Sequence, residues 1–289
     1  MPTTRTRSAP LKPPARRTRA ALARPLFRSG GRALRRWGRQ ALAAIPAASL
    51  PMQFLAAGVL LFALFFAVNW VVQVMRKPAE MFFPVSGALA KMPAETWRQY
   101  GWLFREHSTA VMTPELLAAL AQVETAGNPV ARTYWRWRLT SQLFELYRPA
   151  SSAVGMYQIT DPAFEEARRY CIHDHAVAED GPWHDPRTCW FNRLYTRVIP
   201  GDAIEMTSAF LDRSVANTLA RRGISAATLQ QKQDLAAVIH LCGGGTAEAY
   251  VRRGFRLAPG QRCGDHDAAG YLARLEAMKR LFVRMAGAE

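Results

Sequence analysis

Residues 113–129 read TPELLAALAQVETAGNP, and this stretch predicts an apolar helix with one carboxylate near its end. Thr113 is suited to cap the first helical N–H groups, and Pro114 tolerates the first helical position. Glu115 suits the positive end of the helix dipole. Leucines then recur at helical spacing, and Gly127 is suited to the left-handed conformation that ends a helix. The sequence therefore predicts a buried helix that starts after Thr113 and stops at Gly127.

Glu124 is the residue of this helix that carries chemistry. It follows Leu120 by four residues and Leu117 by seven, so it projects from the apolar face. The negative end of the helix dipole and the apolar surroundings both disfavour the ionised carboxylate, so we expect the pKa of Glu124 to be raised. A carboxyl group that is protonated near neutral pH can act as a general acid. The alternative is a glutamate at the edge of the apolar stripe, neutralised by an arginine.

A second segment, residues 155–160, reads GMYQIT. Together with Glu124-Thr125 and Asn128-Pro129, it resembles the Glu-Ser…Asn-Pro and Gly-Leu-Met-Gln motifs of the lytic transglycosylase domain, which occurs in soluble lytic transglycosylases and their membrane-bound relatives. The resemblance covers roughly residues 94–286. It implies a mainly α, lysozyme-like globular domain of the α+β class.

The activity implied by this resemblance is cleavage of the peptidoglycan glycan strand between N-acetylmuramic acid and N-acetylglucosamine. Glu124, which matches the catalytic glutamate of the family, would first protonate the bridging oxygen. It would then accept a proton from the C6 hydroxyl group, so that the sugar closes to a 1,6-anhydro end. This scheme needs no second catalytic carboxylate, unlike that of most glycosidases, and no cofactor or metal. Asp161, the next acidic residue after the second segment, is expected to cap the following helix, with a catalytic role as the alternative.

The resemblance also implies a set of substrate-binding residues. A glycine allows close approach, and a glutamine amide both donates and accepts hydrogen bonds. The third motif of the family, Ala-Tyr-Asn-Ala-Gly, is degenerate here, with a histidine in place of its tyrosine. That histidine has a buried structural role as its alternative. The expected set is Thr125 (in place of the family's serine), Gly155, Met156, Tyr157, Gln158, His240 and Tyr250.

Two rival functions follow from the same residues. The degenerate third motif favours a glycan-binding scaffold of an envelope assembly, with weakened turnover. A lysozyme-type hydrolase that uses water is the other rival.

Residues 131–149 form an insertion longer than the family usually carries. Trp135, Leu139, Leu143 and Leu146 lie at helical spacing, which predicts an amphipathic helix. Aromatic rings of the insertion either line a sugar-binding groove or belong to the core and its rim, as most tryptophans do.

The N-terminal part of the chain predicts a membrane anchor. Residues 41–75 contain no charged residue, and about 20 apolar residues are enough to span a bilayer. We expect a transmembrane helix at 51–75, with a cleaved signal peptide as the alternative. The first 40 residues hold 12 of the 38 Lys and Arg and none of the 22 acidic residues. The positive-inside rule therefore places the tail in the cytoplasm and the domain in the periplasm, on a single-pass inner-membrane protein.

The expected organisation has four parts. Residues 1–50 form a largely disordered basic tail, 51–75 the transmembrane helix, 76–92 a linker and 93–289 the lytic transglycosylase-like domain. Within the domain we expect helices at 93–108, at 202–222 with Asp202 as cap, through Leu235–Cys242 and through Tyr271–Met285. The expected partners are peptidoglycan strands, membrane lipid through the helix and the tail, and an envelope or secretion apparatus. Nucleic acid is not expected as a partner.

All four cysteines, Cys171, Cys189, Cys242 and Cys263, lie on the expected periplasmic side. An even number of cysteines in an oxidising compartment suggests two disulfides. We expect Cys171 to pair with Cys189 and Cys242 to pair with Cys263, although other connectivities are open. A zinc site built from Cys171, Cys189 and the histidines between them is the alternative.

Overall fold

The computed structural model describes residues 49–82, 85–185 and 187–288, so the predicted basic tail lies almost entirely outside the described residues. The described chain is mainly helical, as predicted. It divides after Val68 into two units, and the site described below lies wholly in the second, which starts at Asn69.

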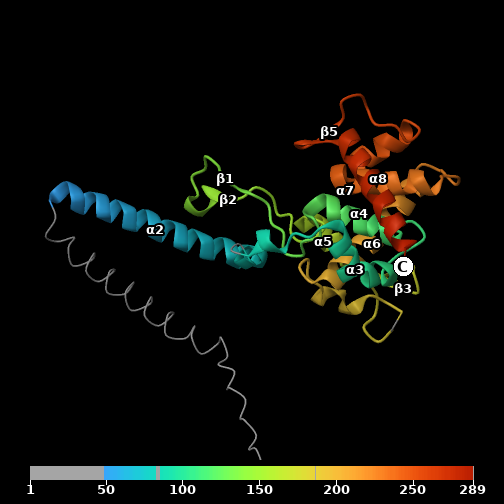
Figure 1. Cartoon of the computed structure of the whole chain (residues 1–289), viewed down its shortest axis with the longest axis horizontal. Helices are drawn as coiled ribbons and strands as arrows, with labels where there is room; N and C mark the ends of the chain where they lie inside the picture. Colours follow the sequence, from blue (N-terminus) through green and yellow to red (C-terminus); the bar gives the residue numbers. More distant parts are fainter. Residues whose placement is uncertain (1–48, 83–84, 186, 289) are drawn as a thin grey trace, which may run out of the picture. The chain divides into compact units, whose positions relative to one another are not determined.

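The helices are α2 (Leu50–Arg76), α3 (Pro93–Glu106), α4 (Pro114–Thr125), α5 (Asp161–Ala167), α6 (Pro200–Arg221), α7 (Leu229–Arg252) and α8 (Ala268–Ala286) (Figure 1). Short 3₁₀ helices are η1 (Pro78–Phe82), η2 (Ser86–Leu89), η3 (Leu143–Glu145) and η4 (Trp190–Leu194). The strands form antiparallel pairs: β1 (Trp135–Trp137) with β2 (Tyr147–Pro149), β3 (Tyr170–His173) with β4 (Ala176–Glu179), and β5 (Arg262–Cys263) with β6 (His266–Asp267).

Helix α2 is the one helix of the described chain that is long and apolar enough to cross a membrane. Its bounds agree with the predicted transmembrane segment at 51–75. Nearly all of its apolar side chains up to Val68 are exposed. Asn69 and Gln73, near its C-terminal end, are buried.

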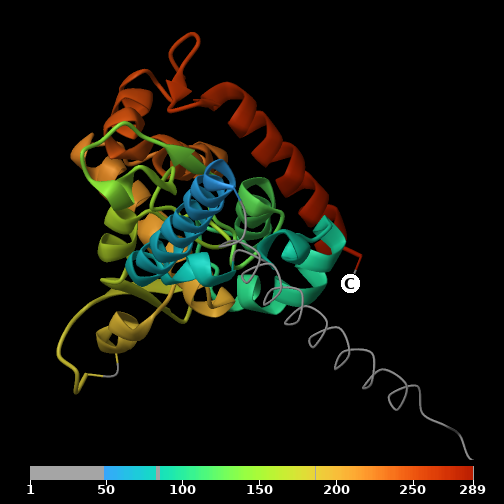
Figure 2. The ribbon, with the colours of Figure 1, turned by 90° about the vertical axis from the view of Figure 1, so that its left-hand side faces the viewer.

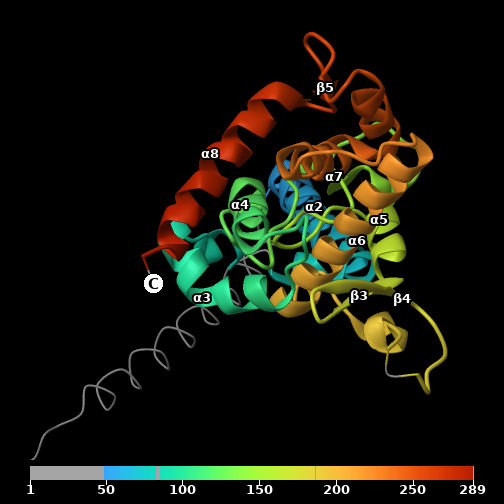
Figure 3. The ribbon, with the colours of Figure 1, turned by 90° about the vertical axis from the view of Figure 1, so that its right-hand side faces the viewer.

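Helix α4 is at the centre of the hydrophobic core of the second unit. Residues 116–121 are buried without interruption, and α4 packs against both α3 and α8. Figures 2 and 3 show α8 along one edge of the domain, with its C-terminal half beside α3. The predicted start is confirmed, because the Thr113 hydroxyl accepts a hydrogen bond from the Leu116 N–H (3.4 Å). Two residues, Ala126 (φ 53°) and Gly127 (φ 66°), are left-handed at the end of the helix.

Two predicted helix caps are wrong. Helix α5 starts at Asp161 itself, and the Asp161 carboxylate pairs with Arg197 (2.8 Å) instead of capping the helix. Helix α6 starts at Pro200, and Asp202 accepts a hydrogen bond from the Thr196 N–H (2.8 Å) in the preceding loop. In both helices the early proline begins the helix sooner than expected, which leaves each carboxylate inside the first turn.

The amphipathic helix predicted within residues 131–149 is also wrong, because this segment forms the β1–β2 hairpin. Trp137 lies opposite Tyr147, with ring centroids 4.8 Å apart, and Trp135 packs on the same tyrosine at 5.2 Å. Alternation in Trp-Arg-Trp has the period of a strand, and aromatic cross-strand pairs stabilise a hairpin. Leu139 is fully exposed, so the leucine spacing does not make a buried face.

The predicted linker at 76–92 contains η1 and η2 and is bonded to the hairpin. Glu80 is fully buried in this linker. Its carboxylate accepts a hydrogen bond from the Trp135 indole (2.9 Å) and pairs with Lys77 (3.2 Å) and Arg132 (3.6 Å). A buried charge network therefore holds the linker against β1 and the residues just before it.

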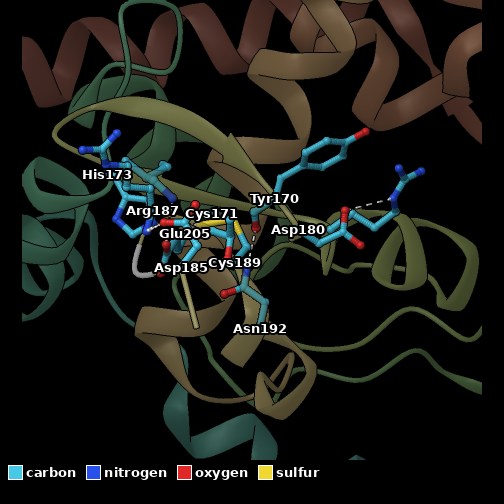
Figure 4. Close-up of a disulfide and its surroundings, with 12 residues drawn as sticks. Tyr170, Cys171, His173, Asp180, Asp185, Arg187, Cys189, Asn192 and Glu205 are labelled. Carbon is cyan, nitrogen blue, oxygen red and sulfur yellow. Dashed lines mark hydrogen bonds and ion pairs between the residues drawn. A yellow bond between two sulfur atoms is a disulfide. The ribbon is translucent and has the colours of Figure 1, made fainter. Parts of the chain in front are cut away.

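Both predicted disulfides are confirmed. Cys171 pairs with Cys189 (Cα–Cα 5.5 Å), and Cys242 pairs with Cys263 (Cα–Cα 5.1 Å). Figure 4 shows the first pair, which joins β3 to the loop before η4. Because both sulfur atoms are in the disulfide, the zinc alternative loses its two thiolate ligands.

The buried position of α4 yields a stability prediction. Replacing Leu120 with Ala should lower the free energy of unfolding by about 2–5 kcal/mol, because Leu120 is fully buried and the substitution leaves a cavity. The exposed Leu194 provides a matched control, and Leu194→Ala should change the free energy by no more than about 0.5 kcal/mol. Urea unfolding of the full chain in detergent, followed by near-UV circular dichroism, measures both values. Equal losses would contradict a core centred on α4.

Candidate functional site

Glu124 lies in the last turn of α4, where three helices meet. Its carboxylate accepts a hydrogen bond from the Tyr271 hydroxyl of α8 (2.5 Å), and the same oxygen lies 3.3 Å from Nε2 of His240 on α7. The Glu124 side chain keeps 16% of its surface exposed, and that of His240 keeps 12%. Glu124 is therefore a nearly buried carboxylate that still reaches the molecular surface.

The pKa of Glu124 is lowered, so the predicted rise is wrong. Burial does raise this pKa, as expected from the apolar face of α4. The hydrogen bond with His240, the charge of His240, the hydrogen bond from Tyr271 and the charge of His266 all lower it, and together they outweigh burial. The pKa of Tyr271 is raised well above its ordinary value by burial and by the neighbouring carboxylate. The phenol therefore stays protonated and keeps donating to Glu124.

A pocket of about 390 Å³ opens beside His240, the α7 partner of Glu124. His240 contacts Glu124 and also lines the pocket, so it connects the carboxylate to the cavity. Gln158 lines it as well; its amide N–H₂ donates to the Gly155 carbonyl (3.0 Å). The rest of the lining comes from Ile159 and Thr160 before α5, and from α5, α6 and the middle of α7; it includes Pro162, Ala163, Glu166, Thr207, Phe210, Gly243 and Gly244.

Several predicted substrate contacts lie in the core instead. Met156 and Tyr157 are fully buried, and the Tyr157 hydroxyl donates to the Leu117 carbonyl (3.1 Å). Tyr250 is also buried, and the tyrosine that contacts the carboxylate is Tyr271. These side chains are large and mostly apolar, so packing around α4 determines where they lie.

Thr125 and Gly155 support the site through contacts within the protein. The Thr125 hydroxyl donates to the Met156 carbonyl (2.9 Å), which joins the end of α4 to the second segment. Gly155 adopts φ 80°, and a Cβ atom there would collide with the Arg197 carbonyl. Glycine is therefore required because the protein's own backbone approaches closely.

The second disulfide lies next to the groups around Glu124. Cys242 follows His240 by two residues and precedes Gly243, whose φ of 76° and ψ of 173° interrupt α7. Cys263 belongs to the β5–β6 hairpin, which carries His266 and leads into α8. The disulfide thus ties the α7 segment with His240 to the segment that supplies His266 and Tyr271.

Sequence reasoning did not assign Tyr271 or His266 to the site. The sequence predicts Tyr271 only as the first residue of the helical stretch Tyr271–Met285. Asp267 caps α8 by accepting a hydrogen bond from the Gly270 N–H (2.8 Å). An aspartate just after the predicted disulfide is a local indication of where this helix starts, but not of what Tyr271 contacts. Contact of Tyr271 with Glu124 arises from the packing of α8 on α4.

Glu205 on α6 is another buried carboxylate, and it has a structural role. It accepts hydrogen bonds from the Ile172 N–H (2.9 Å) and the Tyr195 hydroxyl (2.8 Å), and it lies 3.7 Å from Nδ1 of His107. Figure 4 places Glu205 close to the Cys171–Cys189 disulfide. Its partners come from β3, from the C-terminal end of α3 and from the loop before α6, so Glu205 fastens β3 to α6.

The partners of Glu124 yield a titration prediction. Tyr271→Phe should raise the pKa of Glu124, because it removes a hydrogen bond to the charged form and leaves burial in place. Since the folded pKa lies below the ordinary value of 4.5, ionised Glu124 stabilises the fold above that pH, and this stability is lost as the pH falls through the folded pKa. ¹³C NMR of labelled glutamate measures the shift, with Tyr250→Phe as the control. A pKa that stays constant in Tyr271→Phe would contradict the hydrogen bond.

The two disulfides allow a matched comparison. Their sequence separations are 18 and 21 residues, so removing either should lower the free energy of unfolding by a similar amount, about 3 kcal/mol. Only the Cys242→Ala/Cys263→Ala variant should shift the pKa of Glu124, because only that disulfide adjoins His240, His266 and Tyr271. The Cys171→Ala/Cys189→Ala variant is the control. Equal pKa shifts in both variants would contradict a specific link between the second disulfide and the site.

The chain was compared with protein-family profiles, curated proteins and solved structures, and no significant match was found. The likeness to lytic transglycosylases therefore rests on the two short segments around Glu124 and Gln158. The geometry adds that these segments lie together, since the Thr125 hydroxyl bonds the Met156 carbonyl. The site is best described as a buried, hydrogen-bonded carboxylate beside a partly polar pocket.

Proposed function

We propose that this protein is a membrane-anchored peptidoglycan lytic transglycosylase with the lysozyme-like fold that the resemblance implies. It cleaves between N-acetylmuramic acid and N-acetylglucosamine and leaves a 1,6-anhydro end. The observation that carries the proposal is the position of Glu124. Its carboxyl group lies at the end of a buried helix, reaches the surface and is held by Tyr271 and His240 beside a pocket lined by Gln158.

The proposed reaction needs one carboxyl group that acts twice. Protonated Glu124 gives its proton to the bridging oxygen as the bond from that oxygen to C1 of the muramic residue breaks. The resulting carboxylate then takes the proton of the C6 hydroxyl as O6 bonds to C1. Glu124 ends the cycle protonated, and no water is consumed.

His240 determines how easily Glu124 reaches its acid form. In the free protein the lowered pKa keeps Glu124 ionised at neutral pH. A sugar that enters the pocket meets His240, because this residue lines the cavity. We propose that the bound sugar moves His240 away from Glu124. The hydrogen bond between His240 and Glu124 is then lost, burial remains, and the pKa of Glu124 rises toward the range of a general acid.

The location belongs to the same proposal. Helix α2 would anchor the chain in the inner membrane, with the basic tail in the cytoplasm and the domain in the periplasm. Two disulfides suit an oxidising compartment. Peptidoglycan strands, membrane lipid and an envelope or secretion apparatus are the proposed partners.

A glycan-binding scaffold with weakened turnover is the second candidate, and one observation favours it. The lowered pKa of Glu124 disfavours the acid form; burial raises this pKa, and the strongest opposing effect comes from His240, at the position of the family's tyrosine. A hydrolase that uses water is distinguished from both by its products.

Digestion of purified sacculi by the full chain in detergent separates these functions. Fragments with anhydro ends, identified by mass spectrometry, are expected for the wild type. Glu124→Gln should abolish their release and leave sacculus binding largely intact, because the amide cannot transfer the proton. Glu115→Gln makes the same substitution at the start of the same helix and should retain activity.

Three results would overturn the proposal. Reducing ends would indicate the hydrolase, and binding without release by the wild type would indicate the scaffold. Unchanged release by Glu124→Gln would remove Glu124 from the reaction.

A further inference from the structure

The β1–β2 hairpin presents large apolar side chains to solvent. They come from β1, from the residue just before it and from the segment that connects β1 to β2. Patches of this kind commonly mark contact surfaces for proteins or membranes. The exposed side chains are Tyr134 (64%), Trp137 (60%), Leu139 (105%) and Leu143 (56%).

Positive charge accompanies this apolar surface. Between Ala131 and Thr160 the chain has four arginines and a single acidic residue, Glu145. Glu145 is paired with Arg76 and also with Arg148 (2.5 Å). Arg136 and Arg138, on either side of Trp137, are exposed. The hairpin therefore combines aromatic, aliphatic and cationic groups, which suits the interface of an anionic bilayer.

Polar side chains fasten the hairpin to the C-terminal end of α2. The Asn69 amide donates to the Tyr147 carbonyl (2.7 Å), and the Gln73 amide donates to the Phe144 carbonyl (2.7 Å). Both polar side chains are buried in this contact. The hairpin is thus bonded to the last two turns of the helix.

The position of these bonds along α2 sets their depth in a bilayer. Leu50 to Asn69 spans roughly 28 Å at 1.5 Å per residue, close to the thickness of the hydrocarbon core. Asn69 to Arg76 covers roughly 10 Å more, which corresponds to the headgroup layer. If α2 crosses a bilayer, as in the proposed function, the segment that binds the hairpin lies among the headgroups.

We propose that the β1–β2 hairpin is a second membrane contact of this protein. The side chains of Trp137, Leu139 and Leu143 enter the boundary between headgroups and acyl chains, while Arg136 and Arg138 contact lipid phosphates. The partner is an anionic bilayer surface. This contact holds the domain in one orientation on the membrane.

A fluorescent probe at Leu139 tests the proposal in the full chain. All four cysteines are in disulfides, so Leu139→Cys supplies the single reactive thiol for an NBD label. The protein is reconstituted into phosphatidylcholine–phosphatidylglycerol vesicles that carry nitroxide lipids of known depth. We expect blue-shifted emission and quenching by shallow nitroxides. Leu61→Cys, exposed on α2, should be quenched by deep nitroxides, and Val283→Cys, exposed on α8, should not be quenched.

Each outcome decides one part of the proposal. Quenching at 139 no stronger than at 283, with quenching at 61 intact, would overturn the hairpin contact and leave the anchor standing. Absence of quenching at 61 would overturn both. Energy transfer between hairpins of different copies, lost on dilution into excess lipid, would identify a second copy as the occupant and overturn the proposal. The sacculus assay reads the enzymatic proposal separately.

A separate experiment tests the contribution of Arg136, Arg138 and the anionic lipid. Omitting phosphatidylglycerol should weaken quenching at 139, and so should the Arg136→Glu/Arg138→Glu change in the labelled chain. Quenching at 61 serves as the internal control in both cases. Unchanged quenching at 139 would remove the arginines from the contact.

Discussion

The packing of α8 against α4 is the interaction on which the site depends. Helix α4 is buried along its middle, so its apolar face has to be covered, and α8 covers much of it. The same packing brings the Tyr271 hydroxyl to 2.5 Å from the carboxylate at the end of α4. Hydrophobic burial therefore places the polar contact of the site.

Two opposing effects act on Glu124. Burial favours the neutral acid, whereas His240, Tyr271 and His266 favour the carboxylate and prevail. A group in this position is poised, because a change in one partner alters its protonation. His240 both contacts Glu124 and lines the pocket. A ligand that contacts His240 in the pocket can therefore change the pKa of Glu124.

Polar groups also hold the C-terminal end of α2 and the following linker against the β1–β2 hairpin. Asn69 and Gln73 satisfy hairpin carbonyls, and the buried Glu80 collects Lys77, Arg132 and the Trp135 indole. A buried carboxylate of this kind is tolerated because cations and a hydrogen-bond donor surround it. Residues 76–92, which the sequence predicts to be a linker, are therefore held in place by specific contacts.

The sequence by itself determined the local features of this protein. Helical periodicity and the Thr113 cap located α4, apolar length located α2, and the cysteines paired with their nearest neighbours along the chain. Each of these features depends on residues close in sequence. Tertiary structure alone decided that residues 131–149 form a hairpin, that Met156, Tyr157 and Tyr250 are core residues, and that the pKa of Glu124 is lowered. The physical reason is that side-chain burial and electrostatic balance depend on neighbours from distant helices, and periodicity along one segment carries no information about them.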